Sequence, residues 1–507
     1  MIRWRSRVLP FAISTSFAAA AACSAQQSTE PSNSTEQAST GCAVTPNPSE
    51  SLFVTDPTAL ANFSLGAVMS QIVATGSTTG QTSLELYQQL VDTLNDAAHA
   101  RTKGPHCDDQ KNSSGQPTIN GFPEQFCPRQ EGFLAGTDPF IAPVGDGGTP
   151  NPDSYVTTGL VNRFDLAPNN GANCGQYRVV YGKLSGKTNI FDRMLLIFEA
   201  VLPNPNPSEG LLGCLPVAKF WDDLSADPSP SSRASKLKSF YFNGLKGFAP
   251  VIRAQNYGIG GGTNTGQIRA NMFMFQAPGD PLSGQEWELR EFRLSQSCSG
   301  TGCSLTADNT FVQTNPWGQL FGGTDPQSLA FQNAFLGQVP HLAAKSVAKI
   351  GMSTPTVDDG PQSDEQVPTN QDYFVQAENN TVFLKNITAK LASIGRSDLT
   401  AHNILDRATT QGCAGCHEIA NGRDLGPDGD GGAKLTWPFS NGFTQVDESS
   451  HLSNALIQVF LPARAKVLVG FINAHCATDG GSGSGDGGGP PPPADETVGG
   501  SAIGAAN

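Results

Sequence analysis

The stretch Trp287-Glu-Leu-Arg-Glu-Phe-Arg-Leu294 alternates apolar and charged side chains. Alternation with a period of two is typical of a β-strand that has one face against a core and the other in water. Short runs of similar character, separated by Gly, Pro and Asn, occur at 177–181, 194–202 and 272–276. We therefore expect the region from about 100 to 345 to be β-rich and to have one wetted sheet face.

Apolar residues at helical spacing precede this region. They recur from 60 to 75 and from 83 to 98, which predicts two helices at the start of the folded part. Residues 24–50 contain almost no large apolar side chain and are expected to form a disordered linker. The sequence thus predicts an α+β domain at 51–352, to which the residues alone assign no function.

The first 23 residues have the organisation of an export signal. Three arginines among the first seven residues are followed by the apolar stretch 8–17, the alanines 18–22 and Cys23. The apolar part is too short to cross a membrane, which takes roughly 20 apolar residues, and no later window is expected to do so. The mature chain is expected to be exported.

Ala21-Ala22-Cys23 resembles the bacterial lipoprotein box, except that Ala20 stands where that box has leucine. Lipidation of Cys23 and ordinary signal cleavage both stay open. The expected location is the periplasm or, for a lipoprotein, the outer membrane or cell surface. A lipid anchor is the one expected contact with a membrane.

The formal charge of the chain is -14, and loss of the three signal arginines takes it to -14 - 3 = -17. Such an acidic chain is a poor partner for nucleic acid. It would attract a basic redox protein, although an acidic surface also serves solubility alone.

The motif Cys413-Ala-Gly-Cys416-His417 has the spacing of a covalent haem site. Two thiols one turn apart can each add to a vinyl group of one porphyrin, and the adjoining imidazole can ligate its iron. A thioredoxin-type pair would need a βαβ setting, and a zinc site would need a second Cys or His pair at regular spacing; the sequence shows neither. A structural disulfide would not need the adjoining histidine. The motif predicts one covalent haem c, held by Cys413, Cys416 and His417.

Eleven cysteines occur in the chain, and eight remain after Cys23, Cys413 and Cys416 are set aside. An even number in an exported protein suggests up to four disulfides. Proximity along the chain favours the following pairs: Cys107 with Cys127, Cys174 with Cys214, and Cys298 with Cys303.

A polar, proline-containing segment at 353–371 predicts a linker and a domain boundary. Beyond it we expect helices at 379–394 and at 397–410, the second capped by Ser397 and leading into the haem motif. Helical segments are also expected at 452–461 and from Pro462 to 474. The Gly- and Pro-rich tail 477–507 is expected to be disordered.

The residues from 398 to 476 resemble the cytochrome c superfamily: a short helix ends in CAGCH, irregular loops follow, and a last helix closes the segment. The resemblance covers about a sixth of the chain. It implies a small all-α haem domain at 372–476, behind the β-rich α+β domain, in a multidomain protein. In that family the first and last helices pack together, which would bring Ile404, Leu405 and Ala408 against Val467, Leu468 and Phe471.

Many cytochromes c use a downstream methionine as the second axial ligand. All six methionines of this chain precede Cys413, so the sequence departs from that pattern. His451, 34 residues after His417, is the first candidate for the sixth ligand, and His475 is the second. An exposed His451 and an open sixth position stay an alternative.

These features predict a haem protein that transfers single electrons in the cell envelope, to or from a redox protein or a small-molecule donor or acceptor. If residues 51–352 contain a catalytic site, the haem would serve as its electron relay. Two alternatives stay open: an open-site haem enzyme of the peroxidase type, and a surface-binding lipoprotein in which the haem is secondary. Whether the chain is an enzyme is left undecided.

Overall fold

The computed structural model describes residues 45–140, 151–259, 265–274, 286–364 and 371–475. The predicted signal with Cys23, most of the linker 24–50 and the tail 477–507 lie outside these residues, as do Cys42 and Cys476. Export, lipidation and the disordered tail therefore stay predictions.

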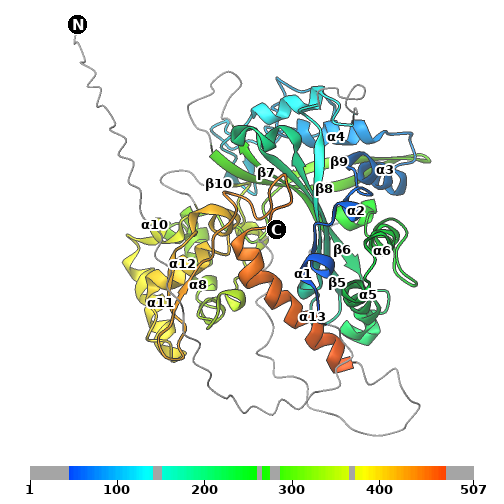
Figure 1. The fold of residues 1–507 in the computed structure, drawn as a ribbon. Coiled ribbons are helices and arrows are strands. Elements are labelled where there is room, and N and C mark those ends of the chain that lie inside the picture. Colours follow the sequence, from blue (N-terminus) through cyan, green and yellow to red (C-terminus); the bar gives the residue numbers. More distant parts are fainter. Residues whose placement is uncertain (1–44, 141–150, 260–264, 275–285, 365–370, 476–507) are drawn as a thin grey trace, which may run out of the picture. The chain divides into compact units, whose positions relative to one another are not determined.

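An eight-stranded antiparallel sheet organises the described chain (Figure 1). Its order is β1–β4–β5–β6–β7–β8, and β9 and β10 both pair with the other edge of β8. The expectation of a β-rich α+β region is confirmed. The strands are β1 (Phe53–Val54), β4 (Tyr155–Arg163), β5 (Asn173–Lys183), β6 (Met194–Pro203), β7 (Gln267–Met274), β8 (Glu286–Ser299), β9 (Gly302–Thr310) and β10 (Ser363–Asp364).

The prediction of one wetted sheet face is wrong. Glu288, Arg290 and Glu291 in β8 are each 0% exposed. The alternation changes phase within the stretch, so Trp287 and Leu289 lie in one apolar cluster and Phe292 and Leu294 in another. Because successive side chains of a strand point to opposite faces, each face is partly apolar and partly charged, and both are covered.

Helices cover the sheet from two sides, and Figure 1 shows α3, α5 and α6 on one side and α10, α11 and α12 on the other. On the first side, Tyr177 of β5 stacks on Trp221 of α5 at a centroid distance of 5.7 Å. The longer helices are α3 (Leu65–Gly76), α4 (Ser83–Asp92), α5 (Leu215–Ala226), α6 (Pro230–Phe242), α8 (Pro326–Phe335), α11 (Thr381–Ser393), α12 (Ala401–Thr409) and α13 (Leu461–His475). The short ones are α1 (Pro48–Ser51), α2 (Pro57–Leu60), α7 (Gln319–Gly322), α9 (Val339–Leu342) and α10 (Tyr373–Ala377).

Helix α12, which leads to the CAGCH motif, begins later than predicted. Its cap is Thr400, whose hydroxyl accepts a hydrogen bond from the backbone N–H of Asn403, while the Asn403 side chain accepts from Thr400 N. This reciprocal pair satisfies two N–H groups that a lone cap at Ser397 would leave without partners.

The segment predicted as a linker is exposed at several residues up to Val357 but is buried from Asp358 to Asp364. Ser363 and Asp364 form β10, and Gln362 is also fully buried. Asp359 accepts hydrogen bonds from the backbone N–H groups of Thr314 and Asn315. The polar composition thus serves internal hydrogen bonds, and no small all-α domain stands apart in the described chain, which lies within one compact unit.

Helix α13 continues from the π-helical turn η10 (Leu456–Phe460). It packs chiefly on α5 and on the 3-10 turn η2 (Phe164–Leu166), where Phe471 lies 4.9 Å from Phe164 between ring centroids. Helix α12 instead packs chiefly on α10, α11 and β11 (Asp424–Pro427). The two helices expected to cross therefore bury their apolar faces mainly against other elements.

Residues Leu456–His475 form a helix that is long and apolar enough, by length and composition, to cross a membrane. The expectation that no segment after the signal is long and apolar enough to cross a membrane is therefore wrong. A third of the apolar window is buried inside the protein, with Leu468 and Ile472 in the core.

Three disulfides are present among the described cysteines, and all three pairs predicted from proximity are confirmed. They are Cys107–Cys127, Cys174–Cys214 and Cys298–Cys303.

We expect the substitution Arg290→Leu to lower the free energy of unfolding by about 3–5 kcal/mol, because it leaves the buried carboxylate of Glu124 without its partner. The exposed pair Lys434–Asp424 provides the control, and Lys434→Ala should barely change stability. Urea unfolding followed by circular dichroism measures both. The double variant Glu124→Leu/Arg290→Leu should recover much of the loss; equal effects of Arg290→Leu and Lys434→Ala would contradict this account.

Candidate functional site

The CAGCH motif starts on a helical turn whose first N–H groups donate hydrogen bonds to side chains of other elements. The backbone N–H of Cys413 donates to Asn315 Oδ1 at 3.4 Å, and that of Ala414 donates to Ser363 Oγ at 2.8 Å. Cys416 and His417 follow within a π-helical turn, η9 (Gly415–Ile419). Because the first N–H groups of a helix have no partner within it, Asn315 and Ser363 fix where the motif lies against the sheet.

Both thiols of the motif are buried, with Cys413 2% and Cys416 0% exposed. Cys413 packs in an apolar cluster with Trp287, Leu289 and Phe443. Neither thiol forms a disulfide, whereas the other six described cysteines are all paired.

Burial raises the pKa of the Cys413 thiol to about 11 and that of Cys416 to about 12. The positive charge of Arg269 opposes the shift at Cys413, but the desolvation of the thiol outweighs it. Reactive cysteines of disulfide oxidoreductases have lowered pKa values and partly exposed sulfur atoms. The arrangement therefore disfavours a thioredoxin-like exchange reaction.

His417 is fully buried, and its ring stacks on the indole of Trp287 with 5.2 Å between centroids. Its Nδ1 lies 3.1 Å from the carbonyl oxygen of Phe443 and 3.4 Å from Nδ2 of Asn271. The shorter contact favours a proton on Nδ1 that is donated to the carbonyl. In this tautomer Nε2 is the unprotonated ring nitrogen, as it is in proteins where a backbone carbonyl orients a histidine ligand.

A chain of ion pairs on the sheet face beneath the motif involves four buried residues. Arg178 Nη1 lies 3.0 Å from Glu199 Oε1. Arg269 lies between two glutamates: its Nε is 3.5 Å from Glu199 Oε2, and its Nη2 is 3.1 Å from Glu291 Oε2. Arg269, Glu199 and Glu291 all act on the charge of the Cys413 thiol, which places the motif next to this chain.

The structure brings Cys413, Cys416 and His417 together in one buried turn. The side chain of His451 is 76% exposed, and its Nδ1 lies 2.9 Å from Asp447 Oδ2. His475 Nδ1 lies 2.8 Å from the carbonyl oxygen of Phe471, at the end of α13. No group of three or more His, Cys, Asp or Glu side chains converges as a metal site within the described residues.

Sequence reasoning missed Trp287, Asn271 and Phe443 as neighbours of His417. Asn271 links Trp287 to His417, because its Oδ1 accepts a hydrogen bond from Trp287 Nε1 and its Nδ2 faces His417. No local signal indicated this, since the three residues stand between 26 and 146 positions from His417 along the chain.

Comparison with family models, with curated proteins and with solved structures finds no match to this chain. The assignment of function therefore rests on the residues and on their geometry.

Proposed function

We propose that the protein carries one haem c, bound through Cys413 and Cys416 and ligated by His417, and that it transfers single electrons in the cell envelope. The supporting observation is the state of the cysteines. In a described chain whose other six cysteines form disulfides, the CAGCH thiols alone are unpaired, one turn apart and next to an oriented imidazole.

The donor set fits covalent haem. Two thiols match the two vinyl groups of a porphyrin, and the Phe443 carbonyl holds His417 in the tautomer that ligates iron. Haem, when bound, supplies one-electron chemistry. Trp287 and Leu289 exclude water from this region, and the buried charges of Arg269 and Glu291 would influence the redox potential.

The burial of both thiols has a consequence for assembly. Cys413 and Cys416 are 2% and 0% exposed, so their thiols are not accessible to a haem-attaching enzyme in the closed fold. We therefore expect haem to be attached before the C-terminal segment that contains the CAGCH motif folds over the sheet. The three disulfides are compatible with maturation in an oxidising compartment, where we place this protein.

The coordination of the sixth position separates electron transfer from a second candidate, an open-site haem protein. The exposure of His451 and its pairing with Asp447 favour a sixth position that this histidine does not fill. The hydrogen bond of His475 to the Phe471 carbonyl engages its Nδ1 at the end of α13. An open position would bind small ligands or peroxide.

In protein made with a haem-attachment system, we expect iodoacetamide to modify neither Cys413 nor Cys416 after denaturation and reduction, because thioether bonds resist reduction. The six disulfide cysteines should all be modified under the same conditions and serve as an internal control. Peptide mass spectrometry reads out each site. Modification of both motif cysteines after reduction would disprove covalent haem.

We expect His451→Ala to leave the absorption spectrum of the haem protein unchanged, because the His451 side chain is exposed and paired with Asp447. His402→Ala is a matched control, since His402 is also exposed and paired, with Asp406. His417→Ala should abolish the normal spectrum. Loss of the low-spin spectrum in His451→Ala alone would instead make His451 the sixth ligand.

A further inference from the structure

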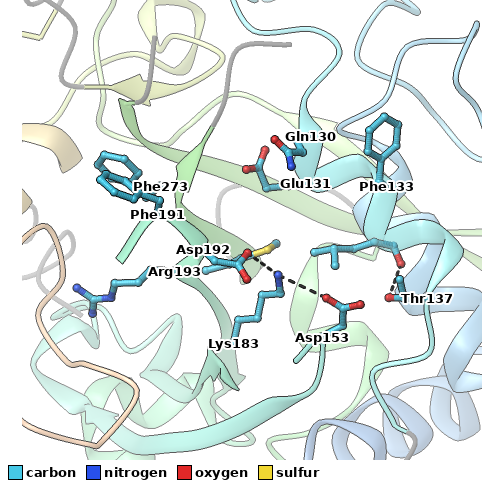
Figure 2. Close-up of a pocket in the computed structure, with 12 residues that line it drawn as sticks. Gln130, Glu131, Phe133, Thr137, Asp153, Lys183, Phe191, Asp192, Arg193 and Phe273 are labelled. Carbon is cyan, nitrogen blue, oxygen red and sulfur yellow. Dashed lines mark hydrogen bonds and ion pairs between the residues drawn. The ribbon is translucent and has the colours of Figure 1, made fainter. Parts of the chain in front are cut away.

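A cavity of about 240 Å³ lies beside the 3-10 helix η1 (Gln130–Gly136) and the start of β6 (Figure 2). The end of β5, Asp153, the 3-10 turn η4 (Ile190–Asp192) and Phe273 of β7 complete its wall. None of the candidate site residues that the sequence indicated lines it. Its volume suits a small molecule rather than a nucleotide or a haem.

One end of the cavity is aromatic. The rings of Phe191 and Phe273 lie 5.5 Å apart between centroids, and Figure 2 shows them together on one side of the cavity. Phe191 is 45% exposed although it is large and apolar. An exposed aromatic ring at the wall of a cavity is the kind of surface that apolar ligand groups cover.

The middle of the cavity, between these rings and Phe133, carries more negative than positive charge. Lys183 Nζ lies 2.6 Å from Asp192 Oδ1 and 3.5 Å from Asp153 Oδ1, so two carboxylates face one ammonium group. Arg193 also lines the cavity, but its guanidinium is paired with Glu448 at 2.8 Å. These charges sum to a negative potential, which favours a cationic ligand over an anionic one.

Glu131 adds a further carboxyl group to the lining. Its Oε2 is buried and accepts no hydrogen bond from the protein, which leaves one acceptor to be satisfied. The charged groups that act on it are Arg129, Glu288 and Lys183. On the neighbouring helix α4, Asp92 is engaged by the backbone N–H groups at 101 and 102.

We propose that this cavity binds a small protonated primary amine that carries an aromatic ring. The ring would lie against Phe191 and Phe273, and the ammonium group would bind among Glu131, Asp153 and Asp192. Lys183, already neutralised by two carboxylates, offers little attraction for an anion. The proposal concerns binding and does not depend on the presence of haem.

Isothermal titration calorimetry of the full-length protein tests this with three ligands of matched size: phenethylamine, the neutral phenethyl alcohol and the anionic 3-phenylpropionate. We expect the amine to bind about tenfold or more tightly than the other two, because a charge-assisted hydrogen bond is worth that much. Phe191→Ala and Asp192→Asn should each weaken amine binding several-fold. Glu209→Gln, an exposed acidic site outside the cavity lining, should not.

The pH dependence provides a second readout. Burial raises the pKa of Glu131 to about 7, so the carboxyl is neutral below that pH and anionic above it. Amine binding should therefore tighten from about pH 6 to about pH 8, where the amine, with a pKa of about 10, stays protonated. Glu131→Gln should remove this change.

Equal binding of the three ligands, or tighter binding of 3-phenylpropionate, would overturn the proposal. So would the absence of measurable amine binding to a wild-type protein that is folded by circular dichroism. An amine affinity that neither Phe191→Ala nor Asp192→Asn alters would place the amine elsewhere on the protein.

Discussion

The buried chain of ion pairs Arg178–Glu199–Arg269–Glu291 is the constraint on which the rest of the structure depends. It runs across strands β5 to β8 on the face that the C-terminal segment covers, and its members are at most 5% exposed. A charge removed from water is tolerated only when its partner is in place, and loss of one partner typically costs about 3–5 kcal/mol. The register of four strands and the covering segment must therefore fit together for the fold to close.

The C-terminal segment that covers this face contains the CAGCH motif. Asn315 and Ser363 hold the first turn of CAGCH against the sheet, and β10 brings Ser363 there. The same closure buries the thiols, raises their pKa values and sets His417 against Trp287. A dry site with a fixed imidazole tautomer suits a covalently bound redox cofactor better than an exchangeable disulfide.

Strand β7 connects the proposed haem site with the proposed amine cavity. Asn271 faces His417, and two residues further along the same face of the strand Phe273 lines the cavity. The Phe273 ring also lies 5.1 Å from Phe443, whose carbonyl accepts the His417 hydrogen bond. A ligand against Phe273 would thus be separated from the His417 environment by one aromatic contact.

The sequence by itself determined features that depend on local spacing. It predicted the strands around Tyr177, Met194 and Trp287, a helix at 379–394 that the structure has at 381–393, three disulfides between cysteines near in sequence, and the CAGCH turn. The tertiary structure alone decided what covers each face: a period of two assigns side chains to opposite faces of β8 but does not say that both are buried. For the same reason it alone placed Trp287 on His417, Ser363 at the start of the motif turn and His451 at the surface. These contacts join residues far apart in the chain, and their stability comes from packing and desolvation that no local pattern records.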